Sequence, residues 1–268
     1  MRYPANRRAK LVTVKLAYRL ASIAVAVAIA FTLTLVLFHF ANSHNVFDIN
    51  RVSISVLLVA TVNTFFRMFV AYAVSLVVAV PLALFVASTP KVQRVMLPIA
   101  DVLQSVPVLA FFPVVVVFFA AYRAFEAAAI FVIFIQMMWN IVFPVVAGLQ
   151  TIPDDIKSFA IVFNVHGFRR FLYITLPAIL PFIITGSLLA WAQGWTIVIV
   201  AEVLHTYIPH GTSSQDLLGL GSLLVDSNAQ GNMSVFGTAL VAMVLLVAFL
   251  NLAVWQPLLR FSQRFRFD

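Results

Sequence analysis

The segment from 153 to 173 places charged and aromatic side chains between two long apolar stretches. Pro153 has the fixed φ of a first helical turn, and Asp154 and Asp155 put negative charge where a helix dipole is positive. Asn164 tolerates the left-handed conformation that ends a helix, and a second helix is expected just after it. The segment therefore predicts two short helices joined at a bend. Such an elbow either binds a partner in water or lies on the membrane as an amphipathic linker.

Amide, hydroxyl and indole side chains interrupt the apolar stretches and are candidates for lining the path of a solute. Gln136 and Asn140 are four residues apart, so they share one face of a helix. Hydrogen bonds between helices explain these side chains nearly as well as a path does, and the two tryptophans at the same spacing can simply pack. The candidates for the path are Gln104, Ser105, Gln136, Asn140, Trp191, Gln193 and Trp195.

The sequence offers no pattern for catalysis, metal binding or nucleotide hydrolysis. The chain has no cysteine, and its 5 histidines lack the spacing of metal ligands. The phosphate-binding motif G-x-x-x-x-G-K-[ST] does not occur. We therefore expect no catalytic residue, no metal site and no cofactor bound by this chain, which is predicted not to be an enzyme.

The composition predicts an all-α integral membrane protein. Of the 268 residues, 63% are hydrophobic and 10% are charged, whereas soluble domains carry roughly a quarter charged residues. A helix needs about 20 apolar residues to cross a bilayer. Internal prolines predict bent helices that pack around a cavity. We expect six transmembrane helices, within the uncharged stretches 20–47, 68–90, 102–122, 127–153, 171–201 and 227–259.

The distribution of lysine and arginine predicts the orientation. With the N-terminus inside, the cytoplasmic segments hold every basic residue except Arg51, Arg67 and Arg123. The positive-inside rule therefore places both termini and the 153–173 segment in the cytoplasm. The net charge of +8 needs no nucleic acid to explain it, because basic helix ends face anionic lipid.

Two charged residues close to the predicted helices need separate interpretations. Counting back from Ser88 by the length of one span sets Arg67 near the outer interface, where a snorkelling side chain is favoured over a buried one. Glu202 is expected to end the fifth helix. There it is either part of an outer gate or docking surface, or a solvated helix end. The polar region that follows it is expected to be extracytoplasmic, with a short surface helix over 215–225 or an ordinary connecting loop.

The 153–173 segment resembles the EAA loop of ABC-importer permeases, in which Glu-Ala-Ala is followed by a glycine and by an Ile-x-Leu-Pro ending. Ser158, Phe159 and Ala160 take the first three positions, and Asn164 takes the position of the glycine. Ser158 and Asn164 depart from the pattern, because they replace an acid and a glycine. The matching residues are Ala160, Ile174, Leu176 and Pro177.

The resemblance extends over nearly all of 55–260 and looks closest to permeases of the nitrate, sulfonate and taurine group. Each motif is weak alone, but together and in this order they are specific. They are Arg67, Pro81 with Leu82, Ser105 to Pro107, Pro113, Ala190 to Glu202, Gly219 to Gly221, and Asn251, Trp255, Pro257, Leu258 and Arg260.

The resemblance implies a type I, MetI-like permease core in the prokaryotic inner membrane. Its partners would be a second permease subunit, two ATPase subunits that hold ATP and Mg, and an extracytoplasmic binding protein that delivers a small anionic or zwitterionic solute. Glu202, Gly219 and Gly221 would belong to the outer gate or to the docking surface. The residues expected to couple the loop to the ATPase are Ser158, Phe159, Ala160, Val162, Phe163, Asn164, Arg169 and Arg170.

The expected layout is a single membrane domain with short termini. Two other functions stay open on the residues alone: a secondary transporter, which would need carboxylates within the membrane, and a membrane scaffold that transports nothing. The segments are a cytoplasmic N-terminus over 1–19, a first transmembrane helix and outer loop over 20–50, the permease domain with its cytoplasmic coupling helix over 51–260, and a cytoplasmic tail over 261–268.

Overall fold

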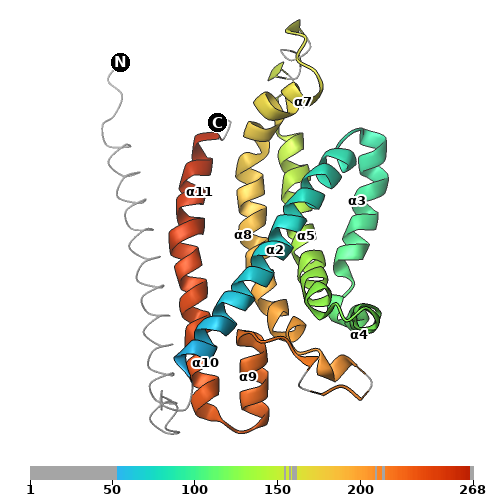
Figure 1. The fold of residues 1–268 in the computed structure, drawn as a ribbon. Coiled ribbons are helices and arrows are strands. Elements are labelled where there is room, and N and C mark those ends of the chain that lie inside the picture. The colour runs from blue at the N-terminus through green and yellow to red at the C-terminus, as the bar shows by residue number, and fades with distance from the viewer. Residues whose placement is uncertain are drawn as a thin grey trace, which may run out of the picture.

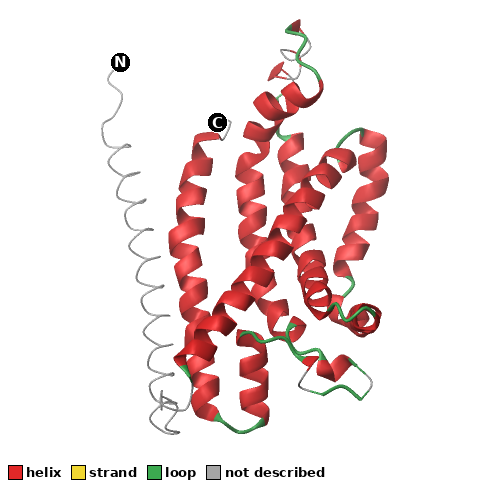
Figure 2. Ribbon diagram, in the orientation of Figure 1, coloured by secondary structure: helices red, strands yellow, loops and turns green. Residues whose placement is uncertain are grey.

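The fold was obtained as a computed structural model, and helices joined by loops and turns make up the described part of the chain (Figure 2). The described residues are 53–153, 155–156, 158, 162–208, 210–212 and 215–265, and none of these lies in a strand. The predicted all-α class is confirmed for this part of the chain.

Helices α2 to α5 form the first half of the described fold, and a π-helical turn η2 leads from the short α7 into the long α8. After the 3-10 turn η3, helices α9 and α10 follow, and a second π-helical turn, η5, leads into α11 and the 3-10 turn η6. The bounds are α2 Ile54–Val86, α3 Pro90–Ser105, α4 Val108–Ala121, α5 Phe125–Gln150, α7 Gly167–Arg170, η2 Phe171–Thr175, α8 Leu176–Ala201, η3 His205–Tyr207, α9 Leu220–Ala229, α10 Met233–Leu250, η5 Asn251–Trp255, α11 Gln256–Ser262 and η6 Gln263–Phe265.

Four described helices are long and apolar enough to cross a membrane, and a bent pair adds a fifth when it is counted as one span. The four are Ile54–Val86, Phe125–Gln150, Gly167–Ala201 and Met233–Ser262. The bent pair is α3 with α4, which meet at 79°. The first predicted helix, within 20–47, lies outside the described residues, so six helices stays a prediction.

Three predicted boundaries were wrong. The second helix begins at Ile54 and not after Arg67, because the buried Arg67 is paired with the buried Glu202 and its charge does not end the helix. The third is broken at Pro107, where the backbone is extended and the ring removes an amide donor. The last stretch holds a tight turn at Gly231 between α9 and α10, so its long helix begins at Met233.

Proline residues account for both π-helical turns. Pro177 and Pro257 each stand two residues after the end of a π-helical turn. A proline in a helix lacks one amide donor, and its ring collides with the carbonyl four residues earlier. A local widening to π geometry relieves that collision while the helix continues. The Leu-Pro at the end of the loop motif therefore stands where the long α8 begins.

Helix α5 is the centre of the fold, packing most extensively against α8 and α2. Ile133, Met137 and Ile141 of α5 are fully buried. A Cβ built at Gly186 of α8 would lie 2.8 Å from the carbonyl oxygen of Asn140, so the two backbones come close. Small residues at such crossings let the two backbones pack closely. This packing holds the helices together inside lipid, where no hydrophobic effect drives them to associate. Figure 1 shows the result, a bundle with α7 at one end and the turn between α9 and α10 at the other. We call these the α7 end and the α9 end.

Candidate functional site

An amide-lined cavity of about 190 Å³ lies between α3, α5 and α8. Gln104, Gln136, Asn140 and Gln193 all line it. The Nε2 atom of Gln136 donates to Oε1 of Gln193 at 3.3 Å, and Nδ2 of Asn140 donates to the carbonyl oxygen of Gln136 at 2.8 Å. The pattern of α5 explains the arrangement, because residues four apart on a helix share a face. Four residues predicted for a solute path thus surround one cavity.

The lining of this cavity suits a small polar solute that must bind and then leave. Among the described residues it holds no acid, no base and no histidine. An amide offers both donors and acceptors, so it can satisfy the oxygens of an anion or the hydrogens of a neutral solute. Because the described lining holds no fixed cation, an anion placed here would meet only neutral hydrogen bonds, which are roughly half as strong as charge-assisted ones.

The other three residues predicted for the path do not line this cavity. The Oγ of Ser105 donates to the carbonyl oxygen of Asp101 at 2.7 Å. Trp191 is 5% exposed and packs against Phe65, Tyr72, Trp195 and Trp255. Its Nε1 atom has no hydrogen-bond acceptor among the described residues.

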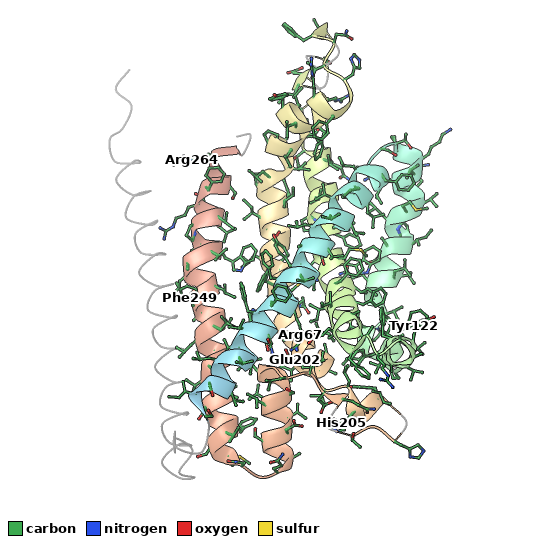
Figure 3. The ribbon with its side chains drawn as sticks, viewed as in Figure 1. Arg67, Tyr122, Glu202, His205, Phe249 and Arg264 are labelled. Carbon is green, nitrogen blue, oxygen red and sulfur yellow. The ribbon has the colours of Figure 1, made fainter. Side chains whose placement is uncertain are left out.

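A buried ion cluster joins α2 to the end of α8 and the start of α5. Nη1 of Arg67 donates to Oε1 of Glu202 at 2.8 Å. Its Nε and Nη2 donate to the two carboxylate oxygens of Glu126 at 2.6 and 2.7 Å. Arg67 and Glu202 are 3% and 0% exposed, whereas Glu126 is 58% exposed. Figure 3 shows the labelled side chains of Arg67 and Glu202 side by side.

Glu202 also fixes the start of α9. Its Oε2 accepts from the backbone N–H of Gly221 at 2.7 Å, and its Oε1 accepts from Oγ1 of Thr64 at 2.7 Å. Thr64 in turn accepts from the N–H of Leu220 at 2.8 Å. A Cβ at Gly219 would collide with the carboxylate of Glu202, so only glycine fits there. The structure thus brings together the three residues that were grouped as the outer gate or docking surface.

Two interpretations of charged residues were wrong. Arg67 is not a snorkelling side chain, because two carboxylates neutralise it inside the protein. Glu202 is not a solvated helix end, because it is fully buried. Glu126 was missed as their partner. The available signal was charge, since an ionisable residue within a span usually has a partner of opposite sign in another span.

The loop before α7 stands out from the α7 end of the bundle (Figure 1). Asn164 has φ +53°, which confirms the predicted left-handed bend, and Gly167 has φ +60°. Val162 is 79% exposed and Phe163 is 63% exposed. Phe159 and Ala160 lie outside the described residues. The part of the loop that the structure describes therefore presents apolar side chains to its surroundings.

The remaining predicted loop residues divide between surface and cavity. Ser158 is helical and exposed, and Arg169 is exposed. Arg170 instead lines a cavity of about 550 Å³ at the α7 end. Adjacent arginines of one helix thus have different surroundings.

A second polar cluster ties down the segment between α8 and α9. The Nδ1 atom of His205 lies 2.6 Å from Oδ2 of Asp216, and the His205 N–H donates to Oδ1 at 2.9 Å. Burial, and then the nearby Asp216 carboxylate, raise the pKa of Asp226 above its ordinary value. The short helix expected over 215–225 begins later, as α9, because the carboxylate of Glu202 fixes its first turn at Gly221.

Comparison with known proteins gives one family and several relatives. Residues 79–266 match the model of the family described as binding-protein-dependent transport system inner membrane component. The chain is 31% identical to the nitrate import permease protein NrtB of Leptolyngbya laminosa over 67% of this chain and 61% of the relative. It is 32% identical to NrtB of Synechocystis sp. over 52% of this chain and 49% of that relative.

A third relative has a different printed substrate. The chain is 26% identical to the bicarbonate transport system permease protein CmpB of Synechococcus elongatus over 65% of this chain and 58% of the relative. The chain therefore spans about half to three fifths of the length of these curated relatives.

Proposed function

The chain belongs to the family of binding-protein-dependent transport system inner membrane components, and from this we propose that it forms the solute path of an ABC importer for a small oxyanion. The relatives named above carry nitrate or bicarbonate in their names. Both are monovalent anions in which three oxygen atoms surround a trigonal nitrogen or carbon atom. The proposed substrate class is therefore a small monovalent oxyanion, delivered by an extracytoplasmic binding protein.

The observation that carries this proposal is the amide-lined cavity. Amide N–H groups of Gln104, Gln136 and Gln193 are matched to the acceptor oxygens of such an anion. A lysine or arginine in the cavity would bind the anion more tightly and slow its release, because charge-assisted hydrogen bonds are stronger. Neutral donors leave affinity to the binding protein and let the permease pass the solute on.

Coupling to a separate ATPase is proposed to run through the loop over 153–173. The exposed apolar side chains of Val162 and Phe163 support this, since apolar surface exposed to water marks a site where a partner can bind. This chain carries no phosphate-binding motif of its own, so ATP and Mg would sit in that partner. The loop would then face the cytoplasm, with both termini on the same side.

The buried ion cluster is proposed to hold the outer end of the path. It joins α2, α5, α8 and the start of α9, so a rearrangement of any one of these elements has to move the others. The exposed carboxylate of Glu126 would face the delivering protein.

Uptake into proteoliposomes tests the proposal. The full chain is reconstituted with the ATPase that copurifies with it and with its binding protein, and nitrate and bicarbonate entry are measured with ATP inside or outside the vesicles. We expect uptake to require ATP on the loop side and to survive an uncoupler. Uptake that requires a proton gradient and ignores ATP would favour a secondary transporter instead.

The variant Gln136→Leu tests the cavity itself. Removing one amide that contacts the solute should lower uptake about two- to tenfold, the effect of losing one hydrogen bond. Gln256→Leu is the matched control, because Gln256 is exposed on α11 and does not line the cavity. Equal uptake by the two variants would contradict a role for the cavity.

A further inference from the structure

A second cavity at the α7 end has a composition unlike that of the amide cavity. It measures about 550 Å³ and lies between the turn from α2 to α3, the end of α5, the last residue of α7 and the end of η2. Its polar side chains are Ser88, Gln93, Gln150, Arg170 and Thr175. Leucine and isoleucine residues form the rest of the wall together with alanine and proline. One lining thus combines a cation, neutral hydrogen-bonding groups and an apolar surface.

Arg170 is the only charged side chain in this lining among the described residues. No described acid pairs with it, and the side chains of Ser88, Gln93 and Gln150 have no hydrogen-bond partner within the described part of the chain. A guanidinium carries five donors in a planar fork that fits the oxygens of a phosphate. The cavity therefore offers unused donors around a single positive charge.

The charge of the cavity limits what it can hold. One cation balances a ligand with one negative charge, such as a phosphate diester, better than it balances a dianion. The apolar wall, which includes Leu84, Ile152 and Ile174, adds a surface that a free phosphate ion would not use. A ligand with a monovalent phosphate next to carbon chains matches both parts of the lining.

The position of the cavity agrees with this chemistry. It lies where α2 and α5 end and α3 begins, next to the loop that is proposed to face the cytoplasm. The inference rests on the proposed function for that orientation alone. Basic pockets between helix ends on the cytoplasmic side are typical sites for anionic lipid headgroups. We infer that this cavity binds the phosphate of an anionic phospholipid, with Arg170 as the residue that recognises it.

Native mass spectrometry of the full chain in a neutral detergent tests the inference. The purified chain is titrated with phosphatidylglycerol or with phosphatidylcholine of the same acyl chains, and retention of each lipid is measured. Arg170→Gln should weaken phosphatidylglycerol binding roughly five- to tenfold, the effect expected for one basic residue at an anionic surface. Arg170→Lys keeps the charge but lacks the planar guanidinium, so it should lose less phosphatidylglycerol affinity than Arg170→Gln does.

Arg169→Gln is the matched control, because it removes the same charge from the neighbouring exposed position. Its affinity for phosphatidylglycerol should stay within twofold of the wild type. Equal losses in the two glutamine variants, or equal binding of both lipids by the wild type, would overturn the inference. Retained helical circular dichroism shows that each variant is folded.

Two further arms identify the source of the phosphate and a competing occupant. Millimolar inorganic phosphate should not displace the lipid. If phosphate displaces it and the chain does not distinguish the two lipids, the site binds free phosphate and the inference of a lipid site is overturned. If Arg170→Gln instead leaves lipid binding intact and abolishes copurification of the ATPase, the cavity is a protein contact and the inference fails. Lipid binding in detergent does not depend on uptake, so failed transport with retained lipid selectivity would count against the proposed function alone.

Discussion

Arg67 and Glu202 form an ion pair across the bundle, with 2.8 Å between Nη1 and Oε1 and no more than 3% of either side chain exposed. The pair joins the middle of α2 to the end of α8, 135 residues apart in the chain. Desolvating two charges is costly, so such a pair persists only where further hydrogen bonds complete it. Here Thr64 and the N–H of Gly221 supply them.

Glu202→Gln should destabilise the folded chain by about 3 kcal/mol. The amide has one acceptor oxygen where the carboxylate has two, so a donor on one side of it would face the amide NH2 group. Thermal unfolding in detergent measures the effect. Glu126→Gln is the matched control, and it should cost about 1 kcal/mol or less because its carboxylate is mostly exposed. A similar loss in both variants would show that burial does not set the strength of this cluster.

Gly186→Ala should destabilise the protein by about 1–3 kcal/mol, the usual cost of overpacking. The added Cβ would meet the backbone of α5 at Asn140 and Ile141, which cannot move without separating the two helices. Gly194→Ala on the same helix should cost less, because its Cβ meets the flexible side-chain ends of Met68 and Met137. Melting temperatures of the two variants compare them directly, and the reverse order would contradict the close helix crossing.

Asp226→Asn should stabilise the protein at neutral pH. Burial and the Asp216 carboxylate raise the pKa of Asp226, so the folded state binds its proton more tightly than the unfolded state does. Stability from this group is then greatest at low pH, and it falls as the pH rises from the unfolded pKa to the higher folded one.

The difference in melting temperature between wild type and Asp226→Asn, measured against pH, isolates this titration from the others. The advantage of the variant should be present at neutral pH and should shrink as the solution is acidified through that window. An advantage that grows on acidification would reverse the sign of the argument.

Val162→Asp should abolish copurification of the ATPase, with affinity lowered at least about tenfold, because a charge replaces an apolar side chain that would be buried on binding. Val162 is 79% exposed, so the chain itself should fold normally. Tyr122→Asp is the control, since Tyr122 is 72% exposed and follows α4, far from the α7 end in Figure 3. Intact ATPase binding by the valine variant would exclude this part of the loop from coupling.

Single cysteines can test the orientation, because the chain contains none. His166→Cys, in the loop before α7, should react with a membrane-impermeant maleimide only after the cells are opened. Gln230→Cys, in the turn between α9 and α10, should react in intact cells. Labelling of His166→Cys in intact cells would show that the chain has the opposite orientation.

The sequence predicted the parts of the fold that local chemistry controls. The helical class follows from composition. The bend at Asn164 and the start of a helix just after it, at Gly167, follow from a residue that tolerates positive φ. The spacing of Gln136 and Asn140 placed both on one face. It could not show that Gln104 and Gln193 share their cavity.

The parts that failed depend on partners distant in sequence. Arg67 was treated as a helix boundary because its charge is visible in the sequence and its burial is not. The break at Pro107 also needed the tertiary structure, since prolines at 81, 113, 144 and 181 lie inside continuous helices. A proline predicts a missing hydrogen bond, but only the surrounding helices decide whether the chain turns there.

The cluster of one guanidinium and two carboxylates carries a surplus negative charge, and its exposed side is the carboxylate of Glu126. That charge acts over a screening length of about 8 Å at physiological salt. An anion that approaches this flank is therefore repelled, whereas a lysine or arginine on an incoming protein is attracted. Electrostatics alone would thus separate the route of a negatively charged solute from the place where its carrier lands.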